Sequence, residues 1–92
     1  MIRLDAGESP CLVFSNRAPQ VSWYSGCRAR VITATRSAAE LPANLRLYLL
    51  AFDRRGHPAA AVAQDALRAA RMDPERIGDE SPRAFLVRLR RR

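Results

Sequence analysis

The segment from Pro58 to Met72 restricts the possible folds most, because it is the one long stretch of the chain with helical periodicity. Proline suits the first position of a helix, where no backbone N–H is needed, and Pro74 prevents continuation of the helix. Six apolar residues at spacings of three and four form one stripe: Ala59, Val62, Ala63, Ala66, Leu67 and Ala70. We therefore expect a helix over residues 58–72, and its mostly alanine stripe predicts a close approach to the element on which it packs.

The remaining apolar residues predict short strands. Alternating or β-branched patterns occur at residues 2–4, 11–15, 21–24, 29–35 and 84–90. Residues 45–53 fit either a central strand with apolar side chains on both faces or a helix, and we favour the strand. The spacing of Ser37 and Glu40 is that of a capping box, which predicts a short helical turn near 38–41. The sequence thus predicts the α+β class, with a small, mostly antiparallel sheet of four to five short strands packed on the helix 58–72.

The length of 92 residues predicts a single domain over residues 1–92, with a basic C-terminal end over 83–92. The longest strongly apolar run, residues 47–52, is far shorter than the roughly 20 residues that span a bilayer. The N-terminus has no apolar segment of the kind that a secretory signal needs. We therefore expect a cytoplasmic protein that does not engage a membrane.

The two cysteines, Cys11 and Cys27, do not have CxxC spacing, and with His57 they do not complete a four-ligand zinc site. In a cytoplasmic chain we expect two reduced, partly buried thiols, with a Cys11–Cys27 disulfide as the alternative. The acidic stretch 73–80 is expected to be a loop, and its spacing does not fit a calcium loop. The sequence predicts neither a metal nor another cofactor.

The charge of the chain is strongly positive and is carried by arginine alone. There are sixteen arginines, no lysine and nine acidic residues, which gives a formal net charge of +7. A GC-rich genome would explain the missing lysines, but codon usage does not explain the excess of positive charge. Guanidinium groups bind carboxylates and phosphates with two parallel hydrogen bonds and stack on flat rings. The chain is therefore expected to bind a negatively charged partner.

Three segments supply candidate binding residues. The last ten residues hold five arginines and no acid, and a turn before His57 holds two more arginines. Trp23 and Tyr24 precede two further arginines, and we expect Trp23 to be buried and Tyr24 to be exposed for stacking on a base. The candidate residues are Tyr24, Arg28, Arg30, Arg54, Arg55, Arg83, Arg88, Arg90, Arg91 and Arg92.

These residues suit three functions. The first is a small non-enzymatic module that binds nucleic acid or a nucleoprotein complex. The second is an adaptor or inhibitor, of the type that phages and mobile elements encode, which engages an acidic surface of a larger protein machine. The third is a ribonuclease-like toxin in which His57 moves a proton and arginine stabilises the phosphorane charge, although one histidine serves only as acid or as base. An exposed strand end also allows a homodimer. Of the three, we favour the nucleic-acid module, with the adaptor or inhibitor as the alternative and the ribonuclease-like toxin as the second alternative.

Overall fold

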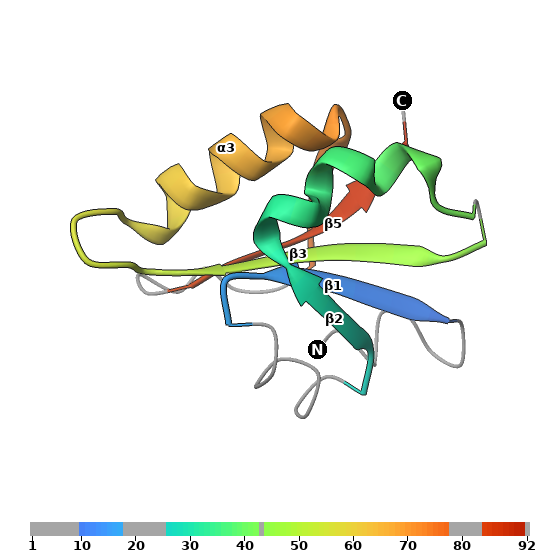
Figure 1. Cartoon of the computed structure of the whole chain (residues 1–92), viewed down its shortest axis with the longest axis horizontal. Coiled ribbons are helices and arrows are strands. Elements are labelled where there is room, and N and C mark those ends of the chain that lie inside the picture. Colours follow the sequence, from blue (N-terminus) through green and yellow to red (C-terminus); the bar gives the residue numbers. More distant parts are fainter. Residues whose placement is uncertain (1–9, 18–25, 43, 78–83, 92) are drawn as a thin grey trace.

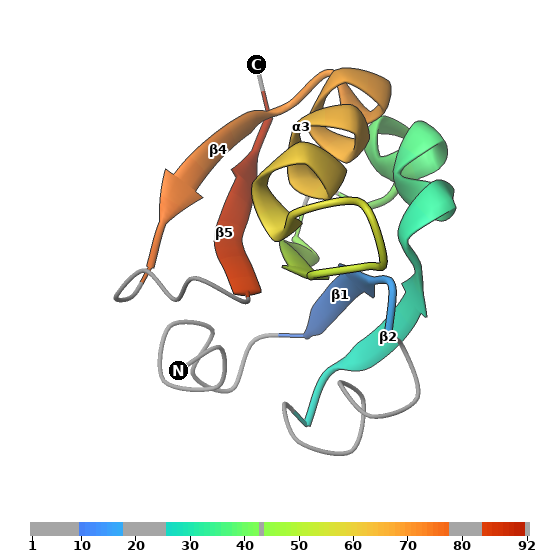
Figure 2. The ribbon, with the colours of Figure 1, turned by 90° about the vertical axis from the view of Figure 1, so that its left-hand side faces the viewer.

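The computed structural model describes residues 10–17, 26–42, 44–77 and 84–91. A five-stranded sheet carries both helical elements on one face (Figures 1 and 2). The elements are β1 (Cys11–Ser15), β2 (Arg28–Val31), the 3-10 helix η1 (Ile32–Glu40), β3 (Arg46–Phe52), α3 (Ala59–Ala70), β4 (Asp73–Arg76) and β5 (Ala84–Arg90). The predicted α+β class, with short strands packed on one alanine-rich helix, is confirmed.

The sheet is mixed, and its strand order is β2-β1-β3-β5-β4. β1 pairs in parallel with both β2 and β3, whereas β5 pairs antiparallel with both β3 and β4. Two helical crossovers make β2, β3 and β4 run in the same direction: η1 connects β2 to β3, and α3 connects β3 to β4. Each crossover passes over the strand that lies between its two ends and returns the chain in the same direction.

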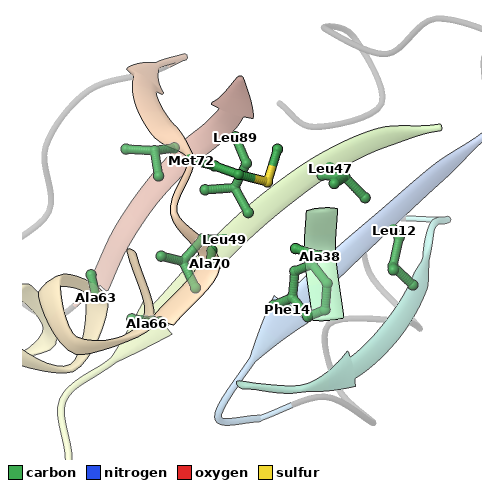
Figure 3. Close-up of a cluster of buried hydrophobic side chains, with 12 residues drawn as sticks. Leu12, Phe14, Ala38, Leu47, Leu49, Ala63, Ala66, Ala70, Met72 and Leu89 are labelled. Atoms are coloured by element: carbon green, nitrogen blue, oxygen red, sulfur yellow. The ribbon is translucent and has the colours of Figure 1, made fainter. Parts of the chain in front are cut away.

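The main core lies between the sheet and the two helices (Figure 3). Alternate residues of β1, β3 and β5 face the helices, and seven of them are buried: Leu12, Phe14, Leu47, Leu49, Ala51, Val87 and Leu89. Ala63, Ala66 and Ala70 of α3 pack against them. Because alanine carries a single methyl group, α3 lies close to the sheet, as its sequence predicts. The expected alternation along β5, with Phe85, Val87 and Leu89 on one face, is also confirmed.

A second cluster occupies the opposite face of the sheet and includes a disulfide. Cys11, Val13, Cys27 and Tyr48 are buried there. Cys11 and Cys27 form a disulfide, so the expectation of two reduced thiols was wrong. The reason is strand register: Leu12 pairs with Arg28, which brings the preceding residues Cys11 and Cys27 to a Cα–Cα distance of 5.1 Å. Nothing in the spacing of the two cysteines indicates that their strands are neighbours.

The expected strand over 29–35 was wrong in its second half, since β2 ends at Val31 and η1 begins at Ile32. The capping box was wrong too, because Ser37 lies inside η1, whose N-cap residue has no side-chain hydrogen bond. Packing decides this segment: Ile32 and Ala34 contact the main core, and the Thr35 hydroxyl donates to the Ile32 carbonyl oxygen at 2.8 Å. These contacts outweigh the preference of β-branched residues for strands.

The acidic stretch 73–80 was expected to be a loop, but Asp73–Arg76 forms the edge strand β4. Proline is tolerated in an edge strand, which explains Pro74. α3 ends earlier than predicted, because Arg71 adopts a left-handed conformation with φ 55° and Met72 turns into the core. The expectation that 45–53 is a strand is confirmed by β3.

The predicted strands at 2–4 and 21–24, and the predicted burial of Trp23, lie outside the described residues. Within the described ranges, no helix is long and apolar enough to cross a membrane.

Candidate polyanion-binding site

Strand pairing places two like charges side by side at one end of the sheet. The β3–β5 ladder ends at the pair Leu47 and Leu89, and the next residues beyond this pair are Arg46 and Arg90. Both arginines are exposed. Like charges directly opposite each other on neighbouring strands destabilise a sheet. Two guanidinium groups side by side repel each other, and bound anions would relieve this repulsion.

A polar hollow of about 450 Å³ lies at the same end of the sheet. Four arginines line it, and we call it the arginine hollow after them: Arg46, Arg88, Arg90 and Arg91. Asn44 adds an amide to the lining, and the apolar part comes from core residues such as Met72 and Leu89. The hollow thus gathers the donors that bind phosphate or carboxylate.

The arginines of the hollow are neutralised to different degrees. The Arg88 guanidinium lies 2.7 Å from a carboxylate oxygen of Glu75, and its side chain is only 25% exposed. The Arg90 Nε lies 3.5 Å from the same oxygen, but its side chain is 66% exposed. Asp73 stands opposite Arg90 on β4 and brings a second carboxylate to this edge. Within the described part of the chain, Arg46 forms no ion pair, so Arg46 and Arg90 have the greatest remaining capacity for a ligand.

Arg91 has a partly structural role. Its guanidinium donates to the carbonyl oxygens of Leu41 and Pro42, the latter at 3.0 Å, just after η1 ends. A cation at this position is favourable because the last carbonyls of a helix carry partial negative charge. The side chain remains exposed and also lines the hollow.

The other predicted arginines lie elsewhere on the molecule. Arg28 and Arg30 are exposed on the edge strand β2, in register with Leu12 and Phe14 and so on the helix side of the sheet. Arg54 and Arg55 are exposed in the turn that follows β3. Since β3 has seven residues, about 20 Å of strand separates that turn from the hollow. The structure therefore brings together Arg88, Arg90 and Arg91, but it does not bring the other four to them. Tyr24, Arg83 and Arg92 lie outside the described residues.

Arg46 was not among the predicted site residues. Its partner in the hollow, Arg90, is 44 positions away along the chain, and only the β3–β5 register brings the two together. Aligning the two strands so that Leu47 lies opposite Leu89 would have placed Arg46 beside Arg90.

The aromatic rings of the described residues do not supply a stacking surface at the hollow. Phe14 and Tyr48 are fully buried, and Phe85 packs against the main core. The Phe52 ring is covered by the Arg17 guanidinium, whose central carbon lies 4.9 Å from the ring centroid. Contacts at the hollow are therefore contacts to charged groups rather than to bases.

The turn that holds His57 is shaped by its backbone. Arg54 and His57 exchange two hydrogen bonds, at 2.8 and 2.7 Å, and Gly56 has φ 80°, which fits a type II turn. The Asp53 carboxylate accepts a hydrogen bond from the Ala59 N–H at 2.7 Å and so caps α3. Asp53 is thereby engaged in a structural contact, which counts against its use as the second proton carrier beside His57.

The described ranges contain no cluster of three or more His, Cys, Asp or Glu side chains placed to hold a metal ion. Comparisons with known protein families, with curated protein sequences and with solved structures give no match. The function is therefore inferred from the residues and their geometry.

Proposed function

We propose that this protein is a small non-enzymatic module that binds the phosphate backbone of nucleic acid through the arginine hollow. The observation that carries the proposal is that Arg46 and Arg90 are exposed, follow the last β3–β5 pair and line one polar hollow with two further guanidinium groups. A phosphodiester group accepts hydrogen bonds from guanidinium on more than one side, and it brings a negative charge to Arg46, which forms no ion pair within the described residues.

The wider charge distribution favours a polyanion over a single small anion. The described residues include thirteen arginines and only five acidic residues: Glu40, Asp53, Asp65, Asp73 and Glu75. A field of this sign raises the rate of encounter with nucleic acid and adds affinity that does not depend on sequence. Among the described residues, the aromatic rings are buried or contacted by other side chains, so we expect contacts to the phosphate backbone rather than to bases.

The proposal is tested by titrating a fluorescein-labelled single-stranded RNA of about 12 nucleotides with the protein and following fluorescence anisotropy. Two to three neutralised phosphates predict that the logarithm of the association constant falls with the logarithm of salt concentration with a slope of about −1.4 to −2. We expect similar affinities for oligonucleotides of different sequence. Failure to bind at about 50 mM salt, or binding that is insensitive to salt, would overturn the proposal.

A further inference from the structure

A second hollow lies between η1 and α3, on the helix side of the sheet. It is a groove of about 360 Å³, and the turn with Arg54 and His57 forms part of its wall. We call it the alanine groove, because Ala61, Ala66 and Ala69 line it along α3. Its volume is at the lower end of the range for sites that take a small ligand or one or two side chains.

The floor of the groove is apolar because short side chains face each other across the two helices. Ile32 of η1 and Val62 of α3 contribute to it, together with the alanines. Thr35 also lines it, but its hydroxyl is satisfied by the Ile32 carbonyl oxygen at 2.8 Å. The floor thus suits an apolar side chain and offers few hydrogen-bond donors to a phosphate.

The rim of the groove is positively charged. Arg36, Arg54 and His57 line it, all three are exposed, and their side chains form no ion pair or hydrogen bond within the described part of the chain. The acidic residue of the lining, Asp65, is paired with Arg68 at 2.7 Å. The groove therefore combines an apolar floor with two guanidinium groups whose charge is not neutralised.

We propose that the alanine groove is the docking site for an acidic segment of a partner protein. An apolar side chain of that segment occupies the floor, and neighbouring carboxylates bind Arg36 and Arg54. The complementarity of charge selects an acidic partner, and the apolar floor selects a polypeptide over a nucleic-acid backbone. Because Arg54 lies beyond the far end of β3 from the arginine hollow, the two sites can be occupied at the same time.

The test uses a fluorescein-labelled peptide with a central leucine flanked by two aspartates and two glutamates. One control peptide carries serine in place of leucine, and a second carries asparagine and glutamine in place of the acids. We expect the leucine peptide to bind and both controls to bind at least about tenfold more weakly. The first control lacks the apolar side chain for the floor, and the second lacks the carboxylates for the arginines. Equal binding of the serine peptide, or no binding of the leucine peptide, would overturn the proposal.

Matched protein variants locate the peptide. Arg36→Gln with Arg54→Gln removes the charges of the rim, and Ala69→Glu places bulk and negative charge in the groove. Ala60→Glu is the control for Ala69→Glu, because Ala60 is exposed on α3 but does not line the groove. We expect about tenfold weaker peptide binding for the first two variants and wild-type binding for Ala60→Glu. Wild-type binding by a folded Ala69→Glu variant, or weaker RNA binding with unchanged peptide binding in the double arginine variant, would contradict the assignment.

Discussion

Replacing Arg46 and Arg90 together by glutamine is expected to weaken binding of single-stranded RNA about 50-fold at about 50 mM salt. Each of the two guanidinium groups is expected to neutralise one phosphate and to release its counterions. Losing two such contacts makes the slope of log affinity against log salt shallower by about 1.4. Fluorescence anisotropy over a salt series measures both quantities, and the difference between the two proteins should shrink as salt rises.

The matched control is Arg54→Gln with Arg55→Gln, which changes the net charge by the same amount at the opposite end of β3. These residues are exposed and lie outside the hollow, so we expect this variant to lose only a few-fold in affinity. An equal loss in the two double variants would show that overall charge, rather than the hollow, determines binding.

The free energy of unfolding of the Arg46→Gln, Arg90→Gln variant shows whether weaker binding comes from a folding defect. Since Arg46 and Arg90 are like charges side by side, their replacement should leave the free energy of unfolding unchanged or raise it slightly. Deleting the C-terminal arginines is a less specific test, because Arg91 also holds the end of η1 through the carbonyl oxygens of Leu41 and Pro42.

Reduction of the Cys11–Cys27 disulfide is expected to lower the free energy of unfolding by about 3 kcal/mol, the value for a closed loop of this length. The two cysteines are 16 positions apart. For a domain of this size, the loss corresponds to a decrease in Tm of roughly 12–24 °C. Thermal unfolding followed by circular dichroism, with and without a phosphine reductant, measures it.

The double variant Cys11→Ala with Cys27→Ala provides the control, since its Tm should be low and insensitive to reductant. A wild-type Tm that does not change after complete reduction, verified by thiol counting, would show that the bridge contributes nothing to stability.

The Cys11–Cys27 disulfide also constrains the strand next to the arginine hollow. Cys11 pairs with Arg46 in the parallel β1–β3 ladder, so the bridge holds the strand that lies beside the hollow. Disulfides persist in oxidising compartments. The bridge therefore points away from the cytoplasmic location that the N-terminal sequence predicts, and that location stays a prediction.

The parts of the fold that could be predicted are those fixed by local pattern. The periodic alanine stripe identifies α3, and the apolar runs identify β3 and β5. The short helical turn expected near 38–41 coincides with the end of η1. The start of η1, β4 and the disulfide could not be predicted, because they depend on contacts between distant segments. Ile32 and Ala34 are helical through packing against the core, and Asp73–Arg76 is a strand because β5 lies beside it.

The arginines of the hollow also divide into those that a local sequence pattern indicates and one that only a distant contact reveals. Arg88, Arg90 and Arg91 were candidates because they are close together in a basic tail. Arg46 stands alone between Leu45 and Leu47 in the sequence, and nothing local distinguishes it from a solvated arginine on a strand. Its importance comes from the β3–β5 register, which the sequence does not specify.

The most direct test of the central claim is an NMR titration of the ¹⁵N-labelled protein with the same single-stranded RNA. If the arginine hollow binds the phosphate backbone, the largest amide shifts will fall in residues 44–47 and 88–91, and they will disappear in the Arg46→Gln, Arg90→Gln variant. Shifts centred on residues 54–57, or small shifts spread evenly over the molecule, would contradict this assignment.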